Sequence, residues 1–343
     1  MKNIYIIFCI LFTAMSASPN TLFDTKEYEL NFSSENINTV KEEKINEIKI
    51  KSFENIIKKI LTNDSLKKIN ITDISLINNF ILNFKVNDEK IINNNYYSKI
   101  QINFNNNLIF DYLIKNKIPY VDQNTSKFLI VIIIKDELQT YLLNQDNVYY
   151  SFLNSSENLL YSQNFILPNL DYNDRYLFNK YEGEFDDLNQ INNLAKKYDS
   201  RYQILIESSK RNNFYDNSIY LIFNKKKYFL KKIQNSQFEF EKLFSQVINL
   251  SKNKWKEINQ IDTSFSNTIL CRLEINNIEE LIYVRKFLKS NRIIKNFQLN
   301  TIELNQNLYE ITYFGNMYVL DNLLEKHRLT LIRENNICII KLI

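Results

Sequence analysis

Two pairs of aspartates are the side chains whose type and spacing could support acid–base chemistry. Asp171 and Asp174 stand three residues apart, and Asp186 and Asp187 are adjacent. A glycosidase needs two placed carboxyl groups on either side of the bond that it cleaves. Aspartate also caps helices and turns by accepting hydrogen bonds from backbone amides. Both pairs lie where turns or helix starts are expected, so capping is the favoured interpretation, most strongly for Asp186.

His327 is the only histidine, and any metal site or Ser-His-Asp triad would have to use it. Such sites recruit several further partners, and the chain has no Gly-x-Ser-x-Gly turn to hold a nucleophilic serine. His327 follows an expected helix, where a cation interacts favourably with the helix C-terminus. Asp171–Asp174 also lacks the further acids and the glycine of a calcium loop. We therefore predict no catalytic residue, no metal ligand and no cofactor.

The composition excludes several classes of partner. The chain has only two glycines, Gly183 and Gly315, so it lacks the glycine-rich loops that approach phosphate in nucleotide enzymes. The 43 basic residues face 39 acidic ones, which gives a net charge of +4 without a basic stripe. Abundant Asn, Ile, Lys, Tyr and Phe have A+T-rich codons, so this bias is genomic. Five arginines of the last 80 or so residues are expected on a solvated surface, and no nucleic-acid partner is predicted: Arg272, Arg285, Arg292, Arg328 and Arg333.

The N-terminus has the pattern of a secretory signal peptide over residues 1–17. Lys2 precedes the apolar run Ile4–Phe12, and small residues follow as far as Ser18. The run is short for a membrane span, although an uncleaved anchor is the alternative. Cys9 lacks the small residues that lipoprotein processing needs before its cysteine. We expect export to the periplasm, and the longest later apolar run, Phe128–Ile134, indicates a buried strand instead of a span.

The rest of the chain is expected to fold as three small α+β units. The first unit spans residues 18–122 and combines a long helix, Val40–Leu61, with a hairpin. In the hairpin's second arm, Tyr96–Phe104, apolar and polar residues alternate, which predicts one buried and one wet face. The second unit, 128–261, has the order β-α-β-α-β-β-α, which favours a layered sheet covered by helices.

The third unit, residues 265–343, has the β-α-β-β-α-β order of the ferredoxin-like split βαβ fold. Its cysteines, Cys271 in the first strand and Cys338 in the last, are expected to face one core from neighbouring antiparallel strands. An oxidising compartment permits a disulfide between them. Bonding requires nearly opposite positions in the strand register, so two buried free thiols remain the alternative.

Three stretches resemble a known family. Tyr97–Pro119 resembles its strand and helix ahead of a strong strand, Phe165–Asp174 its Leu-Pro and Asp-rich segment, and Gly183–Ile206 its helix followed by Arg-Tyr and an apolar strand. The family is the bacterial envelope group called domain of unknown function 2066. This chain has Ser126-Lys127 where the family has Arg-Pro, and it lacks the tryptophan of the strong strand. The resemblance implies a secreted protein of several units, and the family has no known catalytic residues to carry over to this chain.

The element order of the second unit is also similar to the anticodon-binding-like domains of periplasmic activator and secretion lipoproteins, which is an analogy of fold alone. We therefore expect an exported, non-catalytic envelope protein that acts by contacts with a protein partner. The alternatives are an envelope-glycan hydrolase that uses paired carboxylates and a carrier of a lipid or small ligand. An acid-lined cleft would favour the hydrolase, an internal apolar cavity the carrier, and an exposed apolar patch the protein-contact function.

Overall fold

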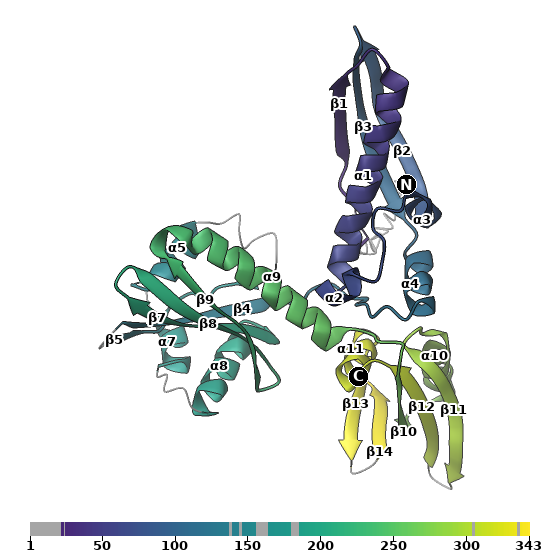
Figure 1. Cartoon of the computed structure of the whole chain (residues 1–343). Coiled ribbons are helices and arrows are strands. Elements are labelled where there is room, and N and C mark those ends of the chain that lie inside the picture. The colour runs from purple at the N-terminus through teal and green to yellow at the C-terminus, as the bar shows by residue number, and fades with distance from the viewer. Residues whose placement is uncertain are drawn as a thin grey trace, which may run out of the picture. The chain divides into compact units, whose positions relative to one another are not determined.

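The computed structural model describes residues 22–23, 25–136, 139–143, 146–155, 164–179, 185–303, 306–334 and 337–343. The predicted signal peptide lies outside these residues. The strands form three separate sheets, and helices alternate with them along the chain, which confirms the predicted α+β class (Figure 1). By compactness the chain divides into one unit of residues up to Lys59 with Ile69–Tyr112, and a second of Ile60–Lys68 with Leu113–Ile343. The predicted central and C-terminal units both fall within the second, each around its own sheet.

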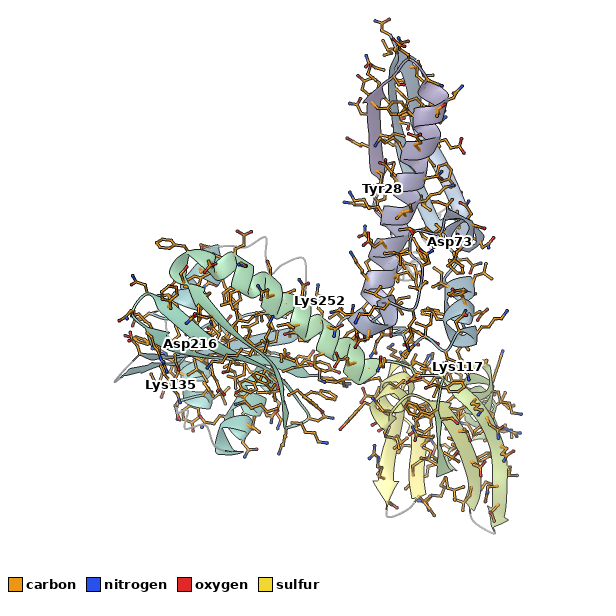
Figure 2. All side chains as sticks on the ribbon, viewed as in Figure 1. Tyr28, Asp73, Lys117, Lys135, Asp216 and Lys252 are labelled. Carbon is orange, nitrogen blue, oxygen red and sulfur yellow. A yellow bond between two sulfur atoms is a disulfide. The ribbon has the colours of Figure 1, made fainter. Side chains whose placement is uncertain are left out.

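The first unit packs a long helix on a three-stranded antiparallel sheet of order β1-β3-β2. In β3, Tyr96, Ile100 and Ile102 are fully buried while Lys99 and Gln101 are half-exposed, so the predicted buried and wet faces are confirmed. Asp73, labelled in Figure 2, caps α3 by accepting a hydrogen bond from the Leu76 amide. The elements are β1 (Tyr28–Ser33), α1 (Ile37–Ile60), α3 (Ile74–Phe80), β2 (Ile81–Ile92), β3 (Asn95–Phe104) and α4 (Asn106–Lys115).

The central part of the second unit is a mixed sheet with helices on both faces. Its strands lie in the order β5-β4-β7-β8-β9, and β6 also pairs with β4. All seven residues of Phe128–Ile134 are buried, as expected for a central strand. Figure 1 shows α5 and α9 on one face and α7 and α8 on the other. The strands are β4 (Phe128–Asp136), β5 (Gln139–Tyr141), β6 (Phe165–Ile166), β7 (Tyr202–Arg211), β8 (Phe214–Phe223) and β9 (Lys226–Ser236).

The helices of this part differ from the expected elements at α7 and α8. The helix α7 (Tyr172–Leu177) occupies a stretch where a turn or a helix start was expected. The helix α8 begins at Phe185, one residue before Asp186, so Asp186 lies in its first turn and does not precede it. The other helices are α2 (Asn63–Leu66), α5 (Val148–Ser155), α9 (Phe240–Asn259) and the short 3-10 turn η1 (Gln237–Glu239).

The C-terminal part carries two helices and a five-stranded sheet of order β11-β12-β10-β14-β13. The first three strands have the predicted split βαβ arrangement, since β12 is antiparallel to both β10 and β11. The strand β13 was not predicted, and its insertion reverses the last strand. As a result β14 runs parallel to β10, not antiparallel. The elements are β10 (Ser266–Glu274), α10 (Ile278–Ser290), β11 (Ile294–Glu303), β12 (Gln306–Phe314), α11 (Met317–Lys326), β13 (Leu329–Glu334) and β14 (Ile337–Leu342).

Candidate functional site

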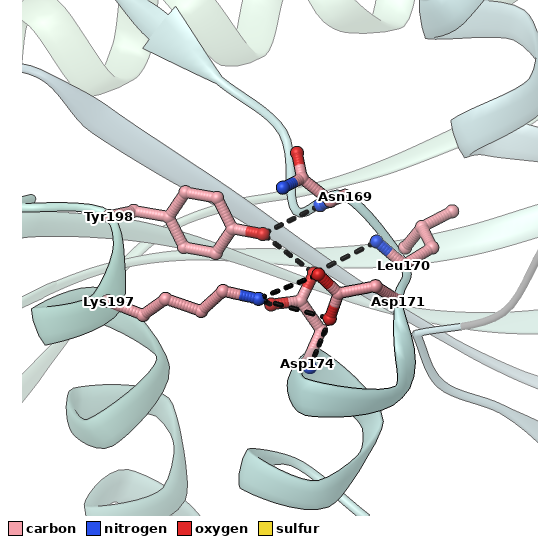
Figure 3. Close-up of polar contacts among 6 residues, drawn as sticks. All are labelled: Asn169, Leu170, Asp171, Asp174, Lys197 and Tyr198. Carbon is pink, nitrogen blue, oxygen red and sulfur yellow. Dashed lines mark hydrogen bonds and ion pairs between the residues drawn. The ribbon is translucent and has the colours of Figure 1, made fainter.

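The predicted carboxylate pair lies at the start of α7, and the end of α8 holds it there (Figure 3). Asp171 is the N-cap of α7, because its carboxylate accepts a hydrogen bond from the Asp174 amide at 2.8 Å. The Lys197 ammonium donates to both oxygens of Asp171 at 3.0 Å and to Asp174 at 2.7 Å. The capping interpretation of Asp171 is therefore confirmed, and one cation joins both carboxylates.

Asp174 is fully buried, and both of its oxygens accept hydrogen bonds. Besides Lys197, it accepts from the Tyr198 hydroxyl at 2.6 Å and from the Leu170 amide at 2.9 Å. The Tyr198 oxygen accepts in turn from the Asn169 amide at 2.7 Å. Leu170 has a φ of 59°, a left-handed conformation that is strained for a branched side chain. The buried carboxylate thus stabilises a strained backbone immediately before α7.

The electrostatics of this cluster suit a structural clamp better than acid–base catalysis. The Asp174 amide and the Lys197 ammonium lower the pKa of Asp171, whereas a general acid needs a raised value. The hydrogen bond to Asp174 raises the pKa of Lys197, so Lys197 stays charged. Burial and the hydrogen bond to Asp174 raise the pKa of Tyr198 to about 12. Asp171, Lys197 and Tyr198 therefore keep the protonation states that hold α7 against α8. We call Asp171, Asp174, Lys197 and Tyr198 the α7 clamp.

The clamped helix exposes two aromatic side chains. Tyr172 is 76% exposed and Tyr176 is 70% exposed. They are four residues apart on a helix, so they lie on the same side of it. Helix α7 has six residues and buries little besides Asp174 within its own length, so its position depends on the clamp. Sequence reasoning found the aspartates but missed Lys197 and Tyr198, because their contacts over 23 to 26 residues leave no local pattern. It missed the tyrosine pair because it did not predict the helix α7.

The other acid–base candidate of the sequence has structural contacts. His327 is the C-cap of α11, and its ring lies 4.1 Å from the Phe287 ring, centroid to centroid. Burial lowers the pKa of His327, so the residue is neutral at pH 7 and does not act as the expected cation at the helix end. The side chains of Asp186 and Asp187 lie outside the described residues. Among the side chains that the structure describes, no group of three His, Cys, Asp or Glu residues could hold a metal ion.

The cysteine pair forms the disulfide that the sequence left open. Cys271 and Cys338 are opposite each other in the register of β10 and β14, with their Cα atoms 4.3 Å apart. The strands are neighbours as predicted, and both residues are buried. Of the arginines, Arg272 pairs with Glu274 at 2.8 Å and Arg333 with Asp321 at 3.8 Å, as on a solvated surface.

No protein-family model and no curated protein matches the chain. Among the solved structures, the chain is similar to the LpoB C-terminal domain from Salmonella enterica, with 11% identity over 38% of this chain and 92% of that chain. The TM-score is 0.23, which is too low to support a conclusion about this protein. Among the described helices, none carries an apolar stretch that could cross a membrane.

Proposed function

We propose that the protein is exported to the periplasm and acts there without catalysis, by binding a protein partner in the cell envelope. The observation that supports this function best is the tyrosine pair on the clamped helix α7. We also propose membership in the envelope group called domain of unknown function 2066, on the resemblance of the three sequence stretches. The signal-peptide pattern of residues 1–17 supports the location.

The tyrosine pair has the physical properties of a protein-binding surface. Tyrosine contributes a large contact area with little loss of side-chain entropy, and it is enriched among the residues that dominate binding energy. Tyr172 and Tyr176 expose more than two thirds of their surface, although such rings usually bury theirs. A backbone held in place by a buried ion pair loses little further freedom on binding, which favours affinity. The α7 clamp therefore supports a surface that is ordered before its partner arrives.

The two alternative functions have less support. A glycosidase needs one carboxyl group of raised pKa, whereas Asp171 has a lowered one and Asp174 is saturated with hydrogen bonds. A lipid carrier needs an enclosed apolar cavity, whereas a cleft of about 850 Å³ among the described residues is open and has mainly polar side chains in its lining.

A photocrosslinking amino acid placed at position 172 or 176 tests the function in the native cell. We expect a discrete protein adduct from both positions. The matched control is position 229, because Phe229 is an aromatic residue of the same unit with 60% exposure and lies on β9, away from α7. The captured partner, purified, should then bind the chain at least tenfold more weakly when Tyr172→Ala and Tyr176→Ala are combined. No adduct, or the same adduct from position 229, would contradict the proposal.

Export has a separate test, so the two parts of the proposal can fail independently. N-terminal sequencing of the cell-derived protein should find a start near Ala17–Pro19 in the periplasmic fraction. An intact Met1 on a membrane-bound product would refute cleavage and export to the periplasm, and would leave the tyrosine surface to its own test.

A further inference from the structure

A second surface of the second unit has a different chemistry. It is an open cleft of about 850 Å³ between α8 and α11. The end of β8, the β8–β9 turn, the start of β7 and the first residues of β13 complete the lining. None of the α7 clamp residues lines it, so it is a separate site.

On α8, one polar stripe faces the cleft. Asn189, Asn192, Asn193 and Lys196 stand at the spacing i, i+3, i+4 and i+7, which places them on one side of the helix. The opposite side is apolar and fully buried against the sheet through Ile191 and Leu194. The buried apolar side therefore fixes the orientation of the helix, and the three asparagine amides line the cleft.

On α11, a second stripe faces the cleft with the same spacing. Its members are Tyr318, Asp321, Asn322 and Glu325. Arg201 at the start of β7 holds this stripe in place, since its guanidinium donates to the Asn322 amide oxygen at 3.0 Å and to the Glu325 carboxylate at 2.5 Å. The cleft is thus built from both sides by helical faces of fixed orientation.

Two buried polar atoms of the lining have no hydrogen-bond partner within the part of the chain that the structure describes. They are Oε1 of Gln203, a residue that is 2% exposed, and Nδ2 of Asn192. One is an acceptor and the other a donor. A buried polar atom without a partner costs free energy, so such atoms in a cleft indicate a place for a polar ligand.

The lining as a whole favours a neutral ligand with many hydroxyl groups. Three basic and three acidic side chains line the cleft, so no charged ligand is selected. Six side-chain amides line it as well: Asn189, Asn192, Asn193, Gln203, Asn224 and Asn322. Asn322 already uses its amide on Arg201 and Asn259, and Gln203 donates to the Ser200 carbonyl. Each of the other four amides carries a donor and an acceptor side by side, which matches hydroxyl groups that do both. Tyr318 adds an aromatic ring against which the C–H face of a sugar ring can pack.

We infer that this cleft binds a neutral oligosaccharide. An open cleft accommodates a chain of sugar units, and the amides of the cleft can form hydrogen bonds with the hydroxyl groups of the sugars. A protein partner would require deep apolar pockets for its anchoring side chains, and the cleft's apolar lining is limited to a few residues such as Ala195, Phe223 and Leu331. The inference does not depend on the tyrosine pair of α7, because the residues differ.

An array of neutral oligosaccharides, including chitotetraose, cellotetraose and maltotetraose, probes the cleft in the full chain. We expect at least one to bind. Asn189→Ala combined with Asn193→Ala should weaken that binding about tenfold or more, as should Tyr318→Ala alone. Neither asparagine has a side-chain hydrogen bond to lose among the contacts described, so folding is preserved. The matched control is Asn296→Ala, since Asn296 is an exposed amide of the same unit on β11, outside the cleft.

Three outcomes would overturn the assignment. They are an array without binding, binding that the cleft variants leave unchanged, and a loss of binding that Asn296→Ala reproduces. A peptide library whose binding is lost only in the cleft variants, with no glycan bound, would also overturn it and assign the cleft to a peptide. Calorimetry with the purified variants measures each fold-change directly.

Discussion

Asp174→Ala removes the centre of the α7 clamp. In the wild-type chain this fully buried carboxylate accepts three hydrogen bonds, from Lys197, Tyr198 and Leu170, at 2.6 to 2.9 Å. The substitution leaves the Tyr198 hydroxyl and the Leu170 amide without their acceptor. It also removes the contact that stabilises the left-handed backbone of Leu170.

The free-energy cost of Asp174→Ala depends on which contacts of the clamp remain in the variant. Loss of one partner of a fully buried ion pair costs about 3–5 kcal/mol. Lys197 is not fully buried, since 27% of its side chain is exposed, and it keeps the Asp171 carboxylate at 3.0 Å. The Lys197 cation therefore keeps a partner. The main cost is that the Leu170 amide and the Tyr198 hydroxyl lose their acceptor, at about 1–3 kcal/mol for each donor. We expect the local opening free energy of α7 to fall by about 3 kcal/mol.

Hydrogen exchange of the full chain measures this local opening directly. The informative amides are those of Leu170, bound to the Asp174 carboxylate, and of Phe178, bound to the Asp174 carbonyl. A loss of about 3 kcal/mol corresponds to roughly 100-fold faster exchange. The matched control Asp171→Ala removes the cap and one of the two carboxylates that Lys197 contacts, while Asp174 keeps that cation paired. Loss of the cap costs about 1 kcal/mol and should give roughly fivefold faster exchange. Unchanged exchange at both amides in Asp174→Ala would refute the clamp.

Three further predictions concern the rest of the chain. Reduction of the denatured protein should expose two more reactive thiols than denaturation alone, because Cys271 and Cys338 are bonded, and equal counts would exclude the disulfide. Lys256→Met should reduce the pH dependence of stability above pH 8. Burial and the neighbouring Lys252 lower the pKa of Lys256 to about 8, so wild-type stability should rise between pH 8 and 10.5. The variant, which also loses the hydrogen bond to the Leu61 carbonyl at 2.7 Å, should show a smaller rise in unfolding curves across this pH range. Residues 262–343 alone should melt cooperatively, since they contain a complete sheet with its two helices, and a spectrum of disordered chain would contradict this.

Elements with strong local patterns could be predicted closely. The helices α10 and α11 and the final strand β14 occupy the places that the predicted β-α-β-β-α-β order of the third unit gives them. Each has a clear apolar period with a definite start or stop, such as the Asn316 cap of α11, whose oxygen accepts from the Tyr318 and Val319 amides. In β3 the alternation of apolar and polar residues also gave the correct buried face.

Elements that depend on contacts with distant residues could not be predicted from the sequence. The strand β13 is at the sheet edge, begins after the left-handed Arg328 and forms only by pairing with β14. Because it was missed, the direction of β14 was predicted wrongly. The expected proximity of Cys271 and Cys338 was nevertheless correct, since neighbouring strands bring them together in either direction. The helix α7 is likewise formed around the buried Asp174, not from a pattern of its own.

The asparagines of the proposed oligosaccharide cleft need an explanation beyond composition. A+T-rich codons account for how many asparagines the chain has, but not for where they lie. On α8 they are at positions 189, 192 and 193, on the side away from the buried Ile191 and Leu194. Lysine is just as favoured by such codons and is soluble on any exposed helix, yet this stripe has one lysine and three amides. A helix face selected only for solubility would tolerate lysine at positions 189 and 193, whereas a face selected for hydroxyl-rich ligands would not. Asn189→Lys with Asn193→Lys should therefore leave the melting temperature unchanged and abolish oligosaccharide binding, and binding that survives both lysines would assign these asparagines to composition alone.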